Sequence, residues 1–375
     1  MKKLLPVVML TLIGLGINAQ SITLPPSGDN QKSSVTQWIG LASITITYNG
    51  PNVTGPNGQD RTGHIWGELV PFGFTDPEYG TSTSAPWRVG ANENTTITFS
   101  HDMKVEGKDI KAGKYGLFLA VQKDGPWTWI FSKDADNWGH YHYNPANDAL
   151  RVDATPSESP FTEFLTFGFD ERLRTSAVAY MQWENKRVGF KVESPQFYDL
   201  YVEKIRAELH GHRMGFSHQT WIDAALFCAQ NKVNLEEALT WAEYAISGRY
   251  IGIEDFNSLS AKAAVLTAMG KESDAENVMA KAITLPSATV QAIHQYGRTL
   301  LAAGKHEKAM EVFRLNQKKH PAEKFTTNVG LARGYTALGD KKNAIKYWEV
   351  AIKNLPENQK PNKAYYEGEL NKLKG

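Results

Sequence analysis

The sequence GKHEKAMEVFRLNQKKHP, residues 304–321, has close counterparts in GDKKNAIKYWEVAIKNLP, residues 339–356, and in GKESDAENVMAKAITLP, residues 270–286. Each segment begins with a glycine, has an alanine five residues later and a large side chain four residues after that, and ends with a proline. The first glycines are 34 and 35 residues apart. A fixed period of this length predicts stacked helical hairpins. Such an array presents a surface to a partner rather than a reaction centre.

The last two repeats follow this pattern most fully. Their matching positions are Gly304, Ala309, Phe313, Pro321, Ala332, Tyr335, Gly339, Ala344, Trp348, Ala351 and Pro356. Through these residues the region 215–375 resembles the tetratricopeptide repeat family. The segment 221–247 is similar to a degenerate first hairpin, with Ala238 and Ala245 at the small-residue positions. The matching residues are structural, so the resemblance implies packing and does not identify a ligand.

The N-terminal half has a different hydrophobic period. Apolar and polar residues alternate in short β-branched and aromatic runs between Ser34 and Glu193, whereas helical spacing begins after Pro195. We therefore predict an all-β domain at 34–194, a β-sandwich or jelly-roll-like fold, then a linker helix at 195–214 and the helical repeats. The predicted strands are 43–48, 95–100, 115–121, 126–131, 150–154, 163–170, 177–183 and 188–192.

Two stretches of the predicted β domain are rich in residues that favour turns. Residues 49–61 contain Gly, Asn and Pro, and residues 75–86 are similarly irregular. Both are long for connections between strands. Long loops on a β scaffold often carry function, so we expect any site of this domain to lie near them.

Several strings extend across most of this half. They are SVTQ at 34–37, ITITY at 44–48, IWGELVPFG at 65–73, WRVGANE at 87–93, AGKYGLF at 112–118 and NWGHY at 137–141. Through them the N-terminal half resembles the bacterial domain-of-unknown-function family 2911. The chain departs from the pattern by extra residues between Phe72 and Trp87. The resemblance implies a secreted all-β domain and implies no reaction.

The N-terminal residues predict export. Lys2 and Lys3 precede an apolar run at 4–17, and Asn18-Ala19-Gln20 provides a cleavage site after Ala19, so residues 1–19 read as a signal peptide. We expect a periplasmic or secreted protein with no stable membrane span after signal removal. The net charge of +1 predicts no nucleic-acid partner. The single cysteine, Cys228, sits in an apolar run and reads as a buried hydrophobe.

A polar constellation precedes one predicted strand. Arg88, Asn92 and Glu93 lie close together in sequence around Gly90. One interpretation is an internal Arg–Glu pair with a capped turn, and the other is a pocket for a sugar, a carboxylate or a peptide end. Trp87 and Trp138 are candidate stacking faces for such a ligand.

His140 and His142 are candidate metal ligands. If they lay in a strand, residues two apart would point to one face and both rings could reach one ion. A third ligand would have to come from His64, Glu68, His101 or Asp136. The alternative is a pair of surface histidines. A second cluster, His210, His212 and His218, reads as part of a flexible turn.

The helical half offers a partner surface made from positions that the repeat pattern leaves free. An extended peptide would suit this polar face, and the alternative is a purely structural solenoid. The candidate contact residues are Gln291, Gln295, Arg298, Asn328 and Arg333.

Three functions remain open at this point. We favour an exported scaffold that binds a protein or peptide partner through its repeats, with a β domain that binds a ligand or serves as a platform. A second hypothesis is a hydrolase of envelope glycan or peptide, with Arg88, Glu93 and His140 in one cleft. A third is a carbohydrate-binding module. Common nucleophile and phosphate-loop motifs are missing from the sequence, so we favour the non-enzymatic function, leave catalytic residues unassigned and expect no cofactor.

Overall fold

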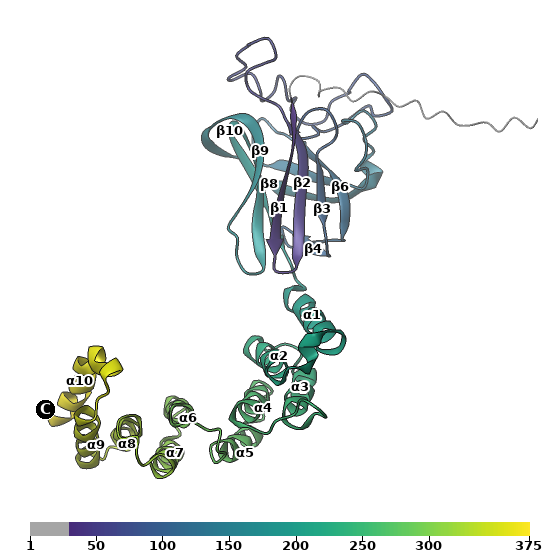
Figure 1. Ribbon diagram of the computed structural model, residues 1–375. Coiled ribbons are helices and arrows are strands. Elements are labelled where there is room, and N and C mark those ends of the chain that lie inside the picture. Colours follow the sequence, from purple (N-terminus) through teal and green to yellow (C-terminus); the bar gives the residue numbers. More distant parts are fainter. Residues whose placement is uncertain (1–29) are drawn as a thin grey trace, which may run out of the picture. The chain divides into compact units, whose positions relative to one another are not determined.

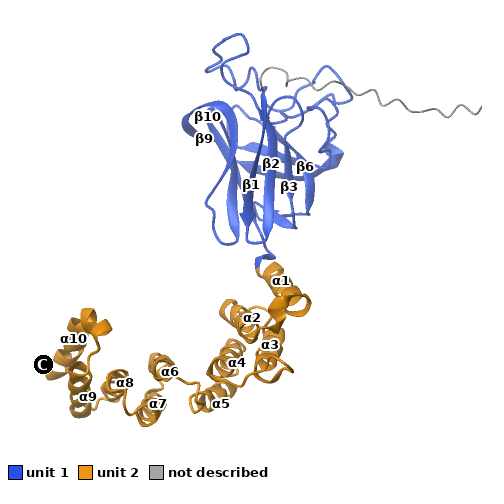
Figure 2. Cartoon of the chain, viewed as in Figure 1, with its two compact units in different colours: residues 1–197 blue, residues 198–375 orange. Residues whose placement is uncertain are grey.

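The computed structural model describes residues 30–375, and the predicted signal peptide lies outside them. The described chain divides into two compact units, residues 30–197 and 198–375, which Figure 2 colours separately. Strands build the first unit and helices build the second, as the ribbon in Figure 1 shows. The prediction of an all-β region followed by a helical repeat array is confirmed. Within the described residues, no helix is long and apolar enough to cross a membrane.

The β unit contains two antiparallel sheets. The six-stranded sheet has the order β1-β2-β3-β6-β7-β8, and the four-stranded sheet has the order β5-β4-β10-β9. Their bounds are β1 (Gln31–Ile39), β2 (Ala42–Gly50), β3 (Thr96–Phe99), β4 (Met103–Val105), β5 (Lys108–Ile110), β6 (Gly113–Ala120), β7 (Trp127–Ser132), β8 (Asp148–Ala154), β9 (Ser157–Asp170) and β10 (Ser176–Glu193), with a short 3₁₀ helix, η2 (Pro145–Asn147), before β8.

Aromatic side chains from both sheets form the core of the β unit. Phe190 of β10 packs against Trp129 and Phe131 of β7, with ring centroids 5.1 and 5.3 Å apart. Tyr48 of β2 meets Phe167 of β9 at 4.9 Å. Alternate residues of β2 are buried, which agrees with the period-two pattern that predicted this strand. These contacts fix the two sheets against each other.

The strand prediction was wrong where it divided β10. Residues 177–183 and 188–192 were expected as separate strands, but they form one strand with register shifts around Glu184. The backbone of Glu184 has a positive φ of 52° and marks a β-bulge. Strands β1, β4 and β5 were not predicted from the sequence. β1 is mostly exposed, and β4 and β5 are only three residues long.

The connection between β2 and β3 supplies the irregular part of the unit. Residues 51–95 contain only isolated bridges, such as Thr75–Ala85 and Trp87–Leu119. Both predicted loops, 49–61 and 75–86, fall largely within this connection. They position the cavity described below.

The helical unit is a series of antiparallel hairpins. Helices α2 and α3, α4 and α5, α6 and α7, and α8 and α9 pack in consecutive pairs. The bounds are α1 (Phe197–Gly211), η3 (Arg213–Phe216), α2 (His218–Asn231), α3 (Leu235–Ser247), α4 (Phe256–Ala268), α5 (Glu272–Ala282), α6 (Val290–Ala302), α7 (His306–Lys319), α8 (Thr326–Ala337), α9 (Lys341–Lys353), η4 (Glu357–Asn362) and α10 (Lys363–Lys374).

The repeated residues have the roles that their spacing predicts. The hairpin glycines Gly270, Gly304 and Gly339 have φ values of 76°, 73° and 77°, a conformation that favours glycine after a helix. The alanines and the large residues that follow them are buried in the hairpin interfaces. These buried residues are Ala275, Ala309, Ala344, Met279, Phe313 and Trp348.

Candidate functional site

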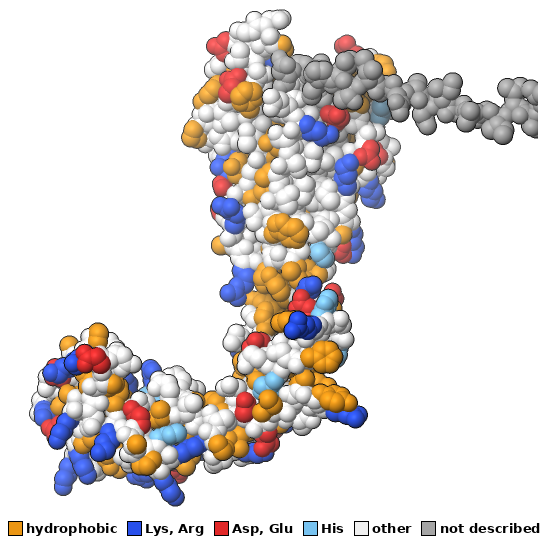
Figure 3. Space-filling model, in the orientation of Figure 1, with side chains coloured by type: hydrophobic (Ala, Val, Ile, Leu, Met, Phe, Trp, Pro, Cys, Tyr) orange, Lys and Arg blue, Asp and Glu red, His pale blue; other side chains and the backbone are white. Residues whose placement is uncertain are grey.

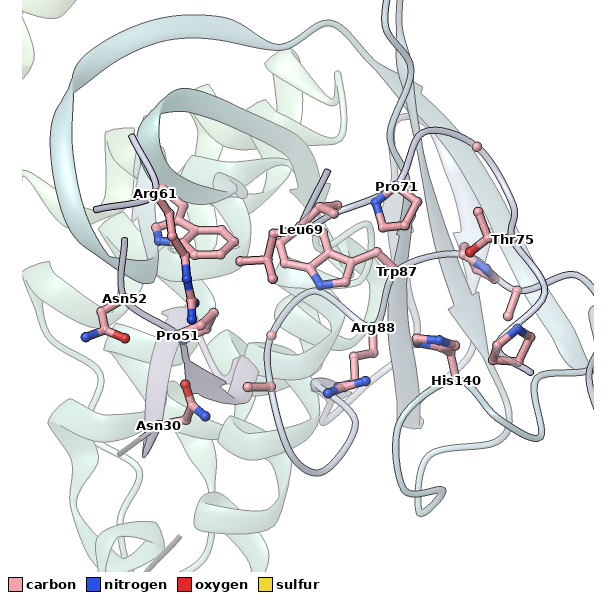
Figure 4. Close-up of a pocket in the computed structure, with 18 of the residues that line it drawn as sticks. Asn30, Pro51, Asn52, Arg61, Leu69, Pro71, Thr75, Trp87, Arg88 and His140 are labelled. Carbon is pink, nitrogen blue, oxygen red and sulfur yellow. The ribbon is translucent and has the colours of Figure 1, made fainter. Parts of the chain in front are cut away.

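The β unit contains a cavity of about 480 Å³ beside the long connection between β2 and β3. Its wall includes residues from both predicted loops, from the WRVGANE string and from the turn at His140, as Figure 4 shows. Five prolines contribute to the wall, and their fixed φ angles limit its motion. These prolines are Pro51, Pro56, Pro71, Pro77 and Pro86.

Two carboxylates of the sheet, of which Glu184 is buried, hold the loops in place. The Glu184 carboxylate accepts a hydrogen bond from the Gly63 backbone N–H at 2.5 Å, and the Glu163 carboxylate accepts one from Thr54 at 2.8 Å. Glu184 is nearly fully buried and reaches the loop because the bulge redirects β10 at this point. The β-bulge at Glu184, which made the strand prediction wrong, therefore helps to position the loops around the cavity.

Tryptophans form one side of the cavity. Trp87 and Trp183 line it and stack with an interplanar angle of 21° and a centroid distance of 6.0 Å. Trp66 contacts both rings at 5.9 Å and also meets Trp127 at 4.9 Å. The interlocked rings hold the Trp87 face rigidly, because each indole limits the rotation of its neighbours.

Arg88 and His140 line the same cavity, and each also has one buried nitrogen without a partner. Arg88 Nε and His140 Nδ1 are buried and have no hydrogen-bond partner. Burial lowers the pKa of the Arg88 guanidinium, an effect that Tyr141 opposes. Burial also lowers the pKa of the His140 imidazole, and the nearby Arg88 charge lowers it further. The two side chains lie next to each other in Figure 4.

A turn of unusual backbone conformation sets the direction of Arg88. Val89 and Asn92 have positive φ values of 53° and 56°, and Gly90 lies between them at 159°. The Thr95 hydroxyl donates to the Val89 carbonyl at 2.8 Å and closes the turn. Positive φ is costly for a valine, so this turn is held by its surroundings.

The Glu93 side chain does not form an ion pair with Arg88. Its carboxylate accepts a hydrogen bond from Asn49 at 2.7 Å and lies 3.9 Å from Lys32, in a separate polar depression of the β unit. The internal Arg–Glu pair considered from sequence is therefore not formed. The hydrolase hypothesis required Arg88, Glu93 and His140 in one cleft, and only Arg88 and His140 share one.

The remaining sequence candidates of this unit are dispersed. Asn92 lies in the turn and is not a wall residue of the cavity, and Trp138 is 58% exposed outside it. Residues 139–142 form a turn rather than the strand that the metal hypothesis assumed, and His142 instead meets the Thr81 hydroxyl at 3.2 Å. Across residues 30–375, no group of three or more His, Cys, Asp or Glu side chains is arranged to hold a metal ion.

The helical unit has a polar groove of about 370 Å³ next to α6, α8 and α10. Gln291, Arg298 and Arg333, three of the predicted contact residues, line it. Arg298 contacts the Gln295 side chain at 3.4 Å, and Arg333 donates to the Tyr365 hydroxyl at 2.9 Å. Among the described residues, no carboxylate lies within 4.0 Å of either guanidinium.

A buried histidine, missed from sequence, completes this groove. His294 is 6% exposed, its Nδ1 has no partner, and burial together with Arg333 and Arg298 lowers its pKa to about 4. The sequence could have indicated His294 as a groove residue, because it lies one helical turn before Arg298. Asn328 is not a surface contact, because it is buried and donates to the Lys324 carbonyl at 2.6 Å. Gln295 is not a wall residue of the groove.

Comparisons with known proteins gave a family match for the β unit and similar solved structures for the helical unit. The family described as "Protein of unknown function (DUF2911)" matches residues 30–192, so the N-terminal resemblance is confirmed. A search of curated proteins gave no match.

Solved structures similar to the helical region include tetratricopeptide repeat proteins. A tetratricopeptide repeat protein from Parabacteroides merdae is 14% identical, with 47% of this chain and 70% of that chain covered and a TM-score of 0.32. The pilF structure from Pseudomonas aeruginosa is 18% identical, with 42% and 67% covered and a TM-score of 0.31. The third is YrrB, described as a TPR protein with an unusual peptide-binding site, at 17% identity, 43% and 82% coverage and a TM-score of 0.29.

Proposed function

We propose that this protein is an exported scaffold whose helical repeats bind a peptide segment carrying a carboxylate, either an acidic side chain or a chain end. The observation that supports this function is the positive groove of α6 and α8. Arg298 and Arg333 face it without a carboxylate partner among the described residues. An acidic group of a partner would satisfy both guanidinium groups by charge-assisted hydrogen bonds.

The one acidic side chain of this groove does not neutralise the arginines. Glu323 lines the groove, but its carboxylate accepts hydrogen bonds from the backbone N–H groups of Thr326 and Thr327, both at 3.1 Å. It therefore caps the start of α8, where a negative charge is favoured. The groove keeps a positive balance for an incoming peptide.

The test is peptide binding by the full chain and by a double variant, Arg298→Gln with Arg333→Gln. Fluorescence polarisation with a library of short acidic peptides should give a subset that the double variant binds about 1–3 kcal/mol more weakly. The matched control is Arg314→Gln, since Arg314 is exposed on α7 and is not a groove residue. Equal binding by the double variant and by the control would refute the assignment of this groove.

Export is the second part of the proposal. It rests on Lys2, Lys3, the apolar run and the Ala19 cleavage signal of the sequence. Mass spectrometry of the protein from its native host should find a mature chain beginning at Gln20 in the periplasm or the medium. A cytoplasmic product that retains Met1 would contradict export.

A further inference from the structure

The cavity of the β unit offers a binding site distinct from the helical groove. Its volume of about 480 Å³ falls within the range of small-molecule sites. Every wall residue belongs to the β unit, so the site does not depend on the proposed peptide groove. Prolines and packed tryptophans form much of the wall, and such a wall can hold a ligand without large rearrangement.

The charge inside this cavity is positive and unbalanced. Arg88 and Arg61 both line it, whereas Asp76 is the only acidic wall residue in the described part of the chain. The Asp76 carboxylate accepts a hydrogen bond from the Glu78 backbone N–H at 2.9 Å and so stabilises its own turn. Among residues 30–375, no carboxylate lies within ion-pair distance of Arg88.

The Arg88 guanidinium is partly buried and has a hydrogen bond with Tyr141, but it meets no anion, and a charge in such a place is unfavourable. Removing a charge from water costs free energy, and an opposite charge with good hydrogen-bond geometry recovers it. Arg88 Nε and His140 Nδ1 are both buried without a partner. Both side chains also line the cavity, where a carboxylate could accept hydrogen bonds from the terminal guanidinium nitrogens of Arg88 and from the imidazole of His140.

The aromatic wall indicates what should be attached to that carboxylate. Trp87 lies directly before Arg88 in sequence, and its ring borders the same cavity. Leu69 and Ala85 add apolar surface nearby. A flat apolar group would stack on the indole face, with its acidic end at Arg88. We propose that this cavity binds a small aromatic carboxylate, held by Arg88 and His140 at its acid group and by Trp87 at its ring.

The experiment is isothermal titration calorimetry of the full chain with benzoate, phenylacetate and cinnamate, each beside its neutral amide. At least one acid should bind with one site per chain, and its amide should bind about 10- to 100-fold more weakly, because the amide lacks the charge that Arg88 would pair. Inorganic phosphate forms a further arm. Phosphate that binds as well as every aromatic acid would show a simple anion site and would overturn the role of the ring.

Variants separate ligand binding from folding. Arg88→Gln should reduce acid binding to the level of the amide, and Arg88→Lys should retain part of it, since only the planar fork is lost. Arg172→Gln is the matched control, because Arg172 is an exposed arginine of the same unit that does not line the cavity. Thermal unfolding gives the second readout. Arg88→Gln should not lower the Tm of the β unit, because it removes a partly buried charge that no carboxylate pairs and its amide can still donate to Tyr141.

The proposal fails if none of the three acids binds, if acid and amide bind equally, or if Arg88→Gln binds like the control. A lower Tm for Arg88→Gln together with unchanged acid binding would assign Arg88 a structural role instead. These results are distinct from a failure of the peptide groove, because Arg298 and Arg333 lie in the other unit.

Discussion

The same substitution, glycine to alanine, should have opposite effects at two helical positions of the repeat unit. Gly297 of α6 lies against the fully buried ring of Phe313, and a Cβ at this position would lie 2.3 Å from Phe313 Cε1. Gly368 of α10 has no atom within 4 Å of such a Cβ. Alanine should therefore clash at Gly297 and fit at Gly368.

The magnitude follows from two terms. Alanine favours a helix interior over glycine by about 1 kcal/mol, and this gain applies at both positions. Overpacking a tight core costs about 1–3 kcal/mol, and a contact of 2.3 Å with a ring that has no exposed surface belongs at the upper end. Gly368→Ala should thus stabilise the helical unit by about 1 kcal/mol and Gly297→Ala should destabilise it by about 2 kcal/mol.

Urea unfolding followed by circular dichroism at the helical band measures both values. A double-mutant cycle with Phe313→Leu tests the cause, because a smaller side chain at 313 should remove most of the penalty of Gly297→Ala. If Gly297→Ala is as stable as Gly368→Ala, or if Phe313→Leu leaves the penalty unchanged, then contact with Phe313 does not explain why residue 297 is a glycine.

Two further predictions use buried groups of the helical unit. The pKa of His294 is near 4 in the folded protein and ordinarily 6.5, so the unfolded chain takes up a proton first as the pH falls. The free energy of unfolding should therefore decrease by about 2 kcal/mol from pH 7 to pH 5. Urea titrations of His294→Asn should lack this part of the pH dependence. Cys228 is buried with its pKa raised to about 11, so a thiol reagent at pH 8 should label the unfolded chain and leave the folded protein unlabelled; rapid labelling of the native protein would contradict its burial.

The helical half was predictable because its signals are local. The glycine that ends one helix and the alanine inside the next are a few residues apart, and their spacing alone specifies a hairpin. The groove was only partly predictable. Arg298 and Arg333 were found because they occupy free positions of the repeat, but Asn328 is turned inward and bonds to Lys324 instead. Side-chain direction depends on packing between hairpins, which one sequence does not specify.

In the β unit, most strands could be predicted from the sequence but the cavity could not. Alternation located most of its strands, yet the cavity depends on contacts between distant residues, such as Glu184 with Gly63. The Arg88 and Glu93 side chains were expected together because they are neighbours in sequence. Positive φ at Val89 and Asn92 separates them into two pockets. Irregular backbone of this kind is held by its surroundings and so has little signature in local sequence.

Both proposed sites have the same arrangement of basic groups. Among the described residues, Arg88 and Arg333 are the arginines whose Nε atoms are buried without a partner. Each borders a cavity that also holds a histidine with an unpartnered Nδ1, His140 in the β unit and His294 in the helical unit. A fold gains no stability from leaving such groups unsatisfied, because each loses its hydrogen bonds to water. The surroundings differ, however, since tryptophan and proline line the first cavity whereas glutamines and tyrosine border the second. In the two proposals, the shared charge is therefore the feature that selects an acid group, and the different walls are the feature that distinguishes a ring in one unit from a peptide in the other.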